Sequence, residues 1–345
     1  MINKQLNGVQ SDIQSESVIN LFSTDEKQTQ LLKKWHKQPW RTYYSLFVPK
    51  TKRKQQKYQA NLLQKKHVAR LWDIFLEKYF KGQLEYFNIK PKKEFKNQKI
   101  IWQYWGQGVE DNLLPDMVKI CFKSVDKYKG EYQVIRLDEN SIADYLDLPS
   151  FVWERKKNPQ FKHAFFADLI RLALLDVYGG IWIDATILLT APIDENILKQ
   201  EFFMFQRHPE AQDKEFWVEF NYDYFGWHDE HYVNVLNSFI VGSKDNKIIH
   251  TCLDIMLNYW QTQKDIPHYF IFQIMFNQLM RLYFSNENNL IVNDTLVHLL
   301  QTKLSDIYQP KDLNVILNQV NIHKMNYIKE PKPGSYYEYL LNNSI

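Results

Sequence analysis

The chain has few cysteines, no long hydrophobic run and no internal repeat. Its two cysteines, Cys121 and Cys252, lie far apart in apolar segments, so they do not make a disulfide framework and favour a reducing compartment such as the cytosol. No stretch approaches the ~18 uncharged apolar residues that a membrane-spanning helix requires. The polar residues 1–14 lack the apolar core of a signal peptide. We therefore expect a cytoplasmic protein without a transmembrane helix.

Apolar and aromatic residues are spread along the whole chain instead. Hydrophobic residues make up 45% of the 345 residues and aromatic residues 15%, which is typical of a globular protein and excludes a largely disordered one. This length suits one large domain or two small ones.

Charge is distributed unevenly. Residues 1–100 contain 21 Lys and Arg and 8 Asp and Glu, a balance of +13, whereas the rest of the chain contains 22 and 32, a balance of −10. Positive charge is densest in residues 49–70 and returns in residues 90–99. Such a patch can bind an anionic membrane surface or a nucleic acid, or can simply be a solvated face. Because no nucleic-acid motif accompanies it, we expect no nucleic-acid partner.

Hydrophobic periodicity predicts an N-terminal helical region followed by an α/β domain. Helical spacing covers residues 15–37 and 56–82, which we interpret as a basic appendage within residues 1–97, with residues 90–99 as a linker. Residues 98–345 alternate between strand and helix patterns, which favours an α/β sheet. The predicted strands are residues 99–105, 132–137, 181–189, 202–206 and 238–241, and the predicted helices are residues 113–127, 162–178, 246–261 and 267–282.

The most apolar part of the chain contains buried charges. Asp168 and Arg171 are three residues apart in a helix that is otherwise almost entirely apolar, so they share one face of a buried helix. Charges in such surroundings are costly unless they are paired. The two residues are either an isolated ion pair within the core or part of a binding site.

A third charge follows a Gly-Gly turn. Gly179 and Gly180 end the helix, because glycine readily adopts the left-handed conformation found there. The buried strand that follows delivers Asp184 to the carboxyl end of the sheet, where α/β sheets bind ligands. A carboxylate at this place can hold a cation or ribose hydroxyls, or can cap a turn.

The run from Asp168 to Thr186, DLIRLALLDVYGGIWIDAT, resembles the core signature of glycosyltransferase family 32 and of the related bacterial capsular polysaccharide synthesis proteins. The shared features are an Asp-x-x-Arg helix, a Gly-Gly turn and a strand that ends in aspartate. Residues 99–106, KIIWQYWG, resemble the opening strand of that family. We take the resemblance to cover residues 98 to about 330 and to leave the N-terminal helices outside.

The resemblance implies a GT-A glycosyltransferase fold, in which a Rossmann-like nucleotide-binding sheet carries helices on both faces. It implies transfer of a sugar, with retention at the anomeric carbon, from a nucleotide sugar to an acceptor hydroxyl, with UDP the favoured nucleotide. Asp168 would bind hydroxyls of the donor sugar, Arg171 would brace the sugar or a phosphate oxygen, and Asp184 would contact ribose and metal. Trp105 or Tyr104 would stack on the base. The residues assigned to donor binding are Tyr104, Trp105, Gly179, Gly180, Asn237, Ser238 and Lys324.

One position departs from the family pattern. Thr186 stands where most members have the second aspartate of Asp-x-Asp, and its hydroxyl is a poorer ligand for Mn²⁺ or Mg²⁺. The capsular branch also resembles this chain in having Asp-Ala-Thr. By resemblance to related enzymes, His323 would join Asp184 and Thr186 as a metal ligand, and Lys324 would be a point charge on the leaving diphosphate. The alternative is that His323 and Lys324 are an exposed polar pair.

The acceptor side has fewer signals. Asp223 and Trp227 lie in a dense aromatic and acidic segment, and His268 opens a predicted helix, so we assign these three to acceptor binding, with packing as the alternative. No unassigned carboxylate stands out as a nucleophile, which favours a front-face retaining route.

The expected acceptor is a lipid-linked oligosaccharide at the inner face of the cell membrane, in bacterial capsular or exopolysaccharide synthesis. The basic N-terminal region would then contact anionic lipid there. The competing hypothesis is a non-catalytic GT-A module that binds a nucleotide or glycan without transfer.

Overall fold

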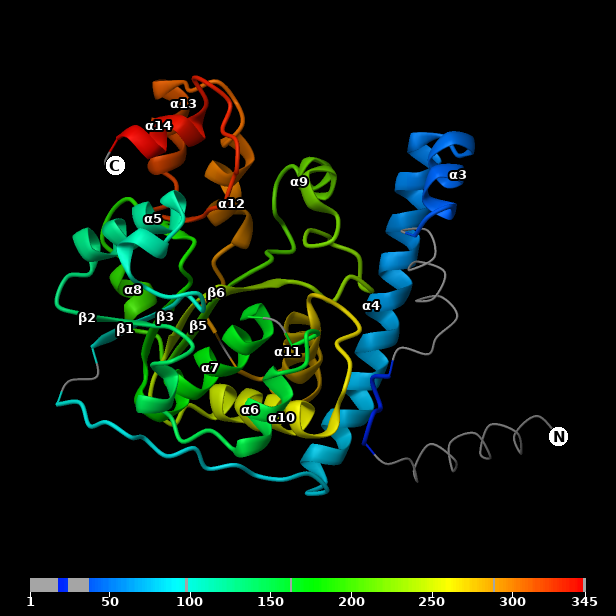
Figure 1. Cartoon of the computed structure of the whole chain (residues 1–345), viewed down its shortest axis with the longest axis vertical. Helices are drawn as coiled ribbons and strands as arrows, with labels where there is room; N and C mark the ends of the chain where they lie inside the picture. The colour runs from blue at the N-terminus through cyan, green and yellow to red at the C-terminus, as the bar shows by residue number, and fades with distance from the viewer. Residues whose placement is uncertain (1–17, 24–36, 97–98, 162, 288, 344–345) are drawn as a thin grey trace.

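The computed structural model describes residues 18–23, 37–96, 99–161, 163–287 and 289–343 (Figure 1). Within these residues the strands are β1 (Ile100–Tyr104), β2 (Gln133–Leu137), β3 (Gly180–Ile183), β4 (Ile187–Leu189), β5 (Phe202–Gln206), β6 (Val235–Gly242) and β7 (Ile322–Lys324). The helices are α3 (Trp40–Phe47), α4 (Lys50–Phe80), α5 (Asp116–Tyr128), α6 (Ser150–Lys156), α7 (His163–Tyr178), α8 (Glu195–Leu198), α9 (Lys214–Asn221), α10 (Lys247–Thr262), α11 (Ile271–Tyr283), α12 (Asp294–Lys303), α13 (Pro310–Leu317) and α14 (Tyr336–Asn342).

The central sheet has the strand order β2-β1-β3-β6-β5. β1 runs parallel to β2 and β3, whereas β6 runs antiparallel to β3 and β5, so β6 alone is reversed in this sheet. Helices flank the sheet (Figure 1). The predicted α/β class is confirmed, and each predicted strand from residue 99 onward has a counterpart in the structure.

The predicted strand 181–189 is wrong in one respect, because it is two strands. The backbone N–H of Asp184 donates to Ser238 O at 2.8 Å, and the N–H of Ile187 then donates back to Asp184 O at 2.9 Å, closing a turn. β4 leaves the central sheet and pairs antiparallel with β7. The apolar run ILL after the turn continues the strand pattern, so hydrophobic pattern alone does not reveal the break.

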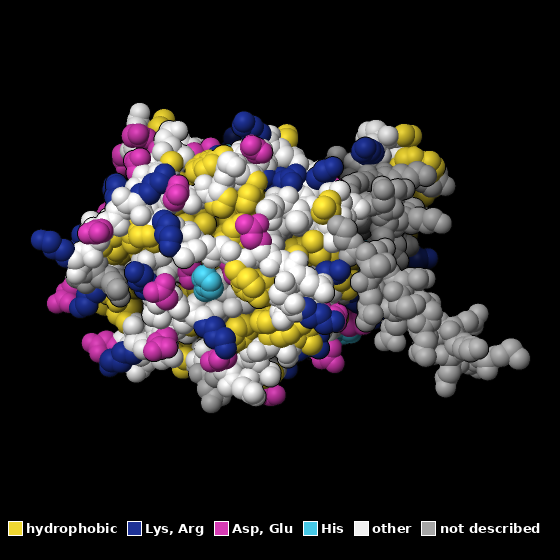
Figure 2. Space-filling view, turned by 90° about the horizontal axis from the view of Figure 1, so that it is seen from below, with side chains coloured by type: hydrophobic (Ala, Val, Ile, Leu, Met, Phe, Trp, Pro, Cys, Tyr) yellow, Lys and Arg dark blue, Asp and Glu magenta, His cyan; other side chains and the backbone are white. Residues whose placement is uncertain are grey.

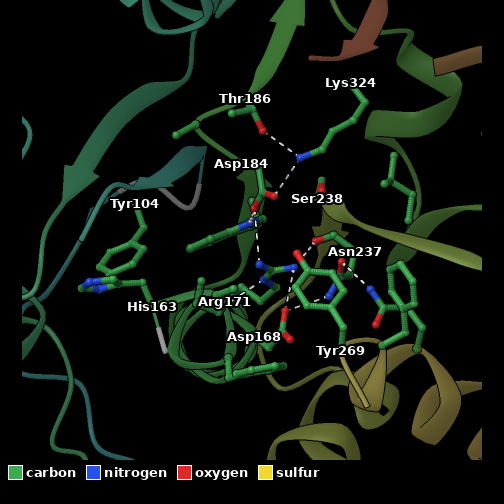
Figure 3. A pocket seen from close by; sticks show the side chains of 18 of the residues that line it. Tyr104, His163, Asp168, Arg171, Asp184, Thr186, Asn237, Ser238, Tyr269 and Lys324 are labelled. Atoms are coloured by element: carbon green, nitrogen blue, oxygen red, sulfur yellow. Dashed lines mark hydrogen bonds and ion pairs between the residues drawn. The ribbon is translucent and has the colours of Figure 1, made fainter. Parts of the chain in front are cut away.

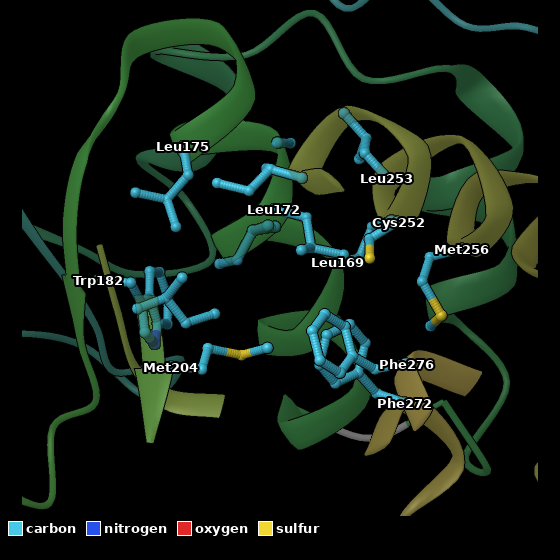
Figure 4. Packing of buried hydrophobic residues seen from close by; sticks show 14 of the residues in the cluster. Leu169, Leu172, Leu175, Trp182, Met204, Cys252, Leu253, Met256, Phe272 and Phe276 are labelled. Atoms are coloured by element: carbon cyan, nitrogen blue, oxygen red, sulfur yellow. The ribbon is translucent and has the colours of Figure 1, made fainter. Parts of the chain in front are cut away.

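Helix α7 is apolar on nearly all sides because it is covered on nearly all sides. It lies between the sheet, which it contacts at β1, β3 and β6, and helix α10. Figure 4 shows Leu169 and Leu172 of this helix among Trp182, Met204 and Cys252 from the neighbouring elements. Both cysteines are buried and free, as expected for a chain without a disulfide framework.

Helix α4 confirms the predicted helix 56–82, but it is not a separate appendage. Trp72 and Phe75 are fully buried in the same cluster as the sheet residues. The Trp72 indole N–H donates to Ile271 O at 3.1 Å, and the Tyr79 hydroxyl donates to Asp254 Oδ2 at 2.8 Å. The boundary expected between residues 97 and 98 therefore marks a change of charge and not a break in packing.

Two further N-terminal predictions are the helix 15–37 and the linker 90–99. Most of the predicted helix 15–37 lies outside the described residues. The predicted linker packs along the main body, since Lys92 N–H donates to Tyr145 O and Asp147 N–H donates to Lys90 O. No helix in the described parts of the chain is long and apolar enough to cross a bilayer.

Candidate active site

A cavity of about 420 Å³ lies where β1 and β3 end. It is lined by residues from β1, α7, β3, α9, β6, α11, α12 and β7, together with the turns between them. Figure 3 shows the predicted donor-side residues around it. The cavity therefore occupies the edge at which the sequence predicted a ligand site.

Arg171 is the centre of the polar network at the base of this cavity. Its Nη1 lies 3.2 Å from Asp168 Oδ1, and its Nη2 lies 3.4 Å from Asp184 Oδ1. Nη1 also donates to Asn237 O at 2.6 Å. The guanidinium, only 4% exposed, thus bridges two carboxylates that are 16 residues apart in sequence. The isolated Asp168–Arg171 pair that the sequence left open is excluded by this arrangement.

Asp168 is held from a second side by an amide chain. Asn237 Nδ2 donates to Asp168 Oδ1 at 2.9 Å, and Gln273 Nε2 donates to Asn237 Oδ1 at 3.0 Å. Burial raises the pKa of Asp168 to about 6, although Arg171 opposes the shift. This carboxyl therefore titrates close to neutral pH.

Asp184 is in a different electrostatic environment. Its Oδ1 accepts from the Trp182 indole N–H at 2.7 Å, and its Oδ2 lies 3.4 Å from Lys324 Nζ. Burial alone would raise its pKa, but Arg171 and Lys324 outweigh burial and hold the pKa of Asp184 below its usual value. Asp184 is thus a fixed anion beside a carboxyl that titrates.

Lys324 reaches the site from the C-terminal part of the chain. Pairing of β4 with β7 sets Lys324 opposite Ile187, one residue after Thr186. The ammonium donates to Thr186 Oγ1 at 2.7 Å (Figure 3). The predicted donor residues Tyr104, Trp105, Asn237 and Ser238 line the same cavity.

The two glycines assigned to donor binding do not reach the cavity. Gly179 and Gly180 lie at the amino end of β3, at the opposite end of that strand from Asp184. Gly180 has φ +106°, and a Cβ there would stand 2.4 Å from Ile100 O. These glycines are required by backbone conformation and close strand packing, and their assignment to donor binding is wrong.

None of the three residues assigned to the acceptor lines the cavity. The backbone of Asp223 accepts from the buried Lys65 ammonium at 2.6 Å. Trp227 lies in a groove between α4 and α9, with its N–H donating to His208 O at 2.9 Å. His268 is buried against Asn61 of α4, and burial lowers its pKa to about 3. These contacts agree with packing, the alternative that the sequence left open, and acceptor binding by these three residues stays a prediction.

The three expected metal ligands do not converge. His323 neighbours Lys324 on β7, so its side chain points to the opposite face of the strand. It is fully buried, with Nε2 3.1 Å from Thr190 Oγ1, and burial lowers its pKa to about 4. In the described part of the chain no group of three His, Cys, Asp or Glu side chains could hold a metal. The Mn²⁺ or Mg²⁺ expected from the resemblance stays a prediction, and this set of donors does not fit it.

Sequence reasoning missed two residues that complete the site. Trp182 and Gln273 orient Asp184 and Asn237 respectively. Tyr269, which directly follows the predicted acceptor residue His268, is 66% exposed and stands at the cavity beside Phe165. Trp182 was interpreted only as a buried strand residue. Nothing in the sequence around Gln273 distinguishes it from other polar residues of an amphipathic helix.

A family model described as "Capsular polysaccharide synthesis protein" matches residues 50–340 of the chain. The chain belongs to this family. The match starts at the first residue of α4, so α4 lies inside the family region, contrary to the expectation that the resemblance begins at residue 98.

Individual relatives are more distant. The chain is 25% identical over 184 residues to an O-glycosyltransferase, PaGT, of Phomopsis amygdali. That match spans 50% of this chain and 41% of PaGT, so the chain covers less than half of this relative.

Solved structures similar to this chain include the PaToxG glycosyltransferase. Its TM-score is 0.32 and its identity 13%, and the match covers 75% of this chain and 85% of that one. Another is a glycosyltransferase involved in glycosylation of the major capsid of PBCV-1. Its TM-score is 0.33 and its identity 9%, and the match covers 66% of this chain and 93% of that one.

Proposed function

We propose that this protein is a glycosyltransferase of the GT-A type that transfers a sugar from a nucleotide sugar, favoured as a UDP-sugar, to a hydroxyl of a saccharide acceptor in bacterial capsular or exopolysaccharide synthesis. The observation that carries the proposal is the bridge from Arg171 to both Asp168 and Asp184 at the base of a cavity at the sheet edge. Family membership and a relative named as a glycosyltransferase support it.

We propose one orientation of the donor in the cavity. The nucleobase would stack on Tyr104 or Trp105 where β1 ends, and ribose would meet Asp184 after β3. The diphosphate would then pass Lys324, and the sugar would reach Asp168 and Arg171 on α7. Ionised carboxylates accept hydrogen bonds from sugar hydroxyls, and the charge makes these bonds stronger than neutral ones.

The side chains of the cavity favour a front-face retaining reaction. Among the described residues the carboxylates that line it are Asp168 and Asp184, and both are engaged with Arg171. The bond from the anomeric carbon to the diphosphate oxygen would break while the acceptor oxygen bonds to the same face. The acceptor proton would pass to the departing phosphate oxygen. Fixed cations stabilise the charge that develops there.

We further propose that the acceptor is a lipid-linked oligosaccharide at the inner face of the membrane, with the basic N-terminal region against anionic lipid. Lys50 and Lys52 are exposed where α3 and the first turns of α4 project away from the sheet (Figure 1). Leu46, beside them, is 73% exposed. In contrast, the underside of the molecule in Figure 2 mixes acidic and basic side chains. A cationic surface with apolar neighbours suits anionic lipid headgroups.

Binding of donors is tested by thermal shift across a panel of UDP-, GDP- and ADP-sugars. A ligand at about a hundred times its Kd stabilises the native state by about 2.7 kcal/mol, so one nucleotide class should raise Tm clearly. Asp184→Asn should abolish that rise. No shift with any member of the panel would contradict the proposal. A non-catalytic module would give the shift without turnover.

A further inference from the structure

The turn that follows β3 carries a cation supplied by the chain. Lys324 Nζ lies 2.7 Å from Thr186 Oγ1 and 3.4 Å from Asp184 Oδ2 (Figure 3). These are the two side chains that correspond to the metal-binding pair of an Asp-x-Asp motif. The Lys324 side chain is 20% exposed, so the ammonium is partly withdrawn from water.

The position of this ammonium is set by backbone pairing. β4 and β7 pair antiparallel, and the N–H of Met325 donates to Thr186 O at 2.8 Å. Lys324 therefore projects from a strand that is bonded to the turn itself. A charge mounted on a paired strand is held in place before a ligand arrives.

The same arrangement is unfavourable for a divalent cation. A metal ion bound between Asp184 and Thr186 would lie close to the positive charge of Lys324. Two positive charges at such a distance repel each other strongly. Asp184 is the carboxylate of this turn, and its Oδ1 is already engaged with Trp182 and Arg171. His323 points to the other face of β7, so it does not add a ligand.

We propose that Lys324 takes the place of the divalent cation, so that this site binds the donor diphosphate, and supports its departure, without metal. The inference rests on the proposed function and concerns the same cavity. When the bond from the anomeric carbon to the diphosphate breaks, the electron pair stays on the phosphate oxygen, and an N–H of Lys324 donates to the diphosphate. The acceptor oxygen forms the new bond to carbon and its proton passes to the diphosphate, which balances the step.

The first experiment measures the affinity for UDP and GDP by calorimetry, in chelator and again with added Mn²⁺. The wild type is expected to bind one of them with the same Kd, within about twofold, in both conditions. Lys324→Met should weaken binding at least about tenfold, since a charge-assisted hydrogen bond is removed. Lys329→Met, a matched change at an exposed lysine outside the cavity, should leave Kd unchanged.

The second experiment exchanges the internal cation for a metal site. The double variant Thr186→Asp with Lys324→Ala restores Asp-x-Asp and removes the ammonium, so nucleotide binding should become dependent on Mn²⁺. Electron paramagnetic resonance should detect bound Mn²⁺ in the double variant and not in the wild type, with and without nucleotide.

Two results overturn the inference while leaving the proposed function intact. One is loss of wild-type nucleotide binding in chelator with recovery in Mn²⁺. The other is uptake of Mn²⁺ by the wild type that Asp184→Asn abolishes. If the wild type binds neither UDP nor GDP in either condition, and no nucleotide sugar of the panel raises its Tm, the proposed function fails and the inference fails with it.

Discussion

Asp168 and Asp184 show how two identical side chains in one cavity acquire different properties. Asp184 has two cations within 3.4 Å and an indole N–H donor, so its pKa is lowered. Among the described residues Asp168 forms an ion pair with Arg171 alone, and burial raises its pKa to about 6. Two acids in one site whose pKa values differ in this way commonly have different functions. We propose that Asp184 is a permanent negative charge in the site and that Asp168 contacts the sugar.

Replacing Asp168 by Asn should separate function from stability. Because burial raises the pKa of Asp168 to about 6, the ionised carboxylate opposes folding by up to about 3 kcal/mol at neutral pH, so Asp168→Asn should keep or raise Tm. Turnover of the donor should fall at least about a hundredfold, because the charge that holds Arg171 and the sugar is lost. For the same reason, wild-type turnover should fall as pH is lowered through about 6.

The control for this change lies on the same helix. Asp176 is also buried on α7, but it pairs with His250 outside the cavity. Asp176→Asn should leave turnover within about threefold of the wild type. If Asp168→Asn lowers stability, and turnover falls only as far as the fraction of folded protein falls, Asp168 has no role of its own in the reaction.

At the residue scale, the sequence predicted those site residues whose chemistry conflicts with their surroundings. Asp168, Arg171 and Asp184 were identifiable because charge is unexpected in an apolar segment. Gln273 was not, because an amide on an amphipathic helix conflicts with nothing. Trp227 lies outside the cavity, and its assignment to the acceptor stays a prediction, because aromatic side chains beside carboxylates suit packing as well as they suit sugars.

At the scale of elements, the Gly-Gly turn joins α7 to β3 in a space with no room for a side chain. The turn determines where β3 starts, and therefore it determines the position of Asp184, which directly follows β3. The sequence predicted the turn correctly, but the family resemblance led us to place its glycines with the donor. Close approach of Gly180 to Ile100 O depends on strand pairing that is distant in sequence, so no local pattern reveals it.

Gly180→Ala should therefore damage folding. A Cβ at φ +106° and 2.4 Å from Ile100 O should lower the free energy of unfolding by several kcal/mol. Gly130→Ala, with φ +56° and nothing within 4 Å of its Cβ, should cost only about 1 kcal/mol. Urea unfolding measures both. A stable Gly180→Ala protein that has lost nucleotide binding would restore the donor-binding assignment.

Helix α4 is joined to the α9 side of the molecule by a buried lysine. Lys65 Nζ donates to Asp223 O at 2.6 Å and lies 3.3 Å from His231 Nδ1, and burial lowers its pKa to about 7. The unfolded chain keeps its proton up to a pKa of 10.5, so between pH 7 and 10.5 the unfolded state binds more protons. The stability contributed by Lys65 therefore rises with pH across this window.

Lys65→Met should remove this dependence. The difference in unfolding free energy between wild type and Lys65→Met should change in favour of the wild type by up to about 1.4 kcal/mol per pH unit between pH 7 and 10. Denaturation at a series of pH values measures it. Parallel curves for the two proteins would show that Lys65 is not the buried titrating group.

At the scale of the whole molecule, alternation of strand and helix patterns was sufficient to predict the α/β class. It was not sufficient to predict that α4 shares the core, because the basic first half of α4 suggested an independent region. The apolar residues of its second half, such as Trp72 and Phe75, pack on a surface contributed by residues almost 200 positions later, including Ile271 (199 positions after Trp72). Contacts of this range leave no periodic signal beyond the helix itself.

The charge imbalance along the chain leads to a prediction about membranes. Because each basic residue near an anionic surface contributes about 1 kcal/mol, Lys50→Gln with Lys52→Gln should weaken binding to phosphatidylglycerol vesicles at least about tenfold. Lys311→Gln with Lys329→Gln, exposed lysines elsewhere, should have little effect. Sedimentation with vesicles at low and high salt measures this, and equal binding to neutral and anionic vesicles would contradict it.

The central claim is that the cavity holding Asp168, Arg171 and Asp184 transfers sugar from a nucleotide donor. The most direct measurement is release of nucleoside diphosphate from a panel of nucleotide sugars by the purified protein. The account predicts that at least one donor is turned over, and that Asp184→Asn, folded to the same extent, releases nucleoside diphosphate at least about a hundredfold more slowly. Release from no donor, or equal release by wild type and Asp184→Asn, would contradict it.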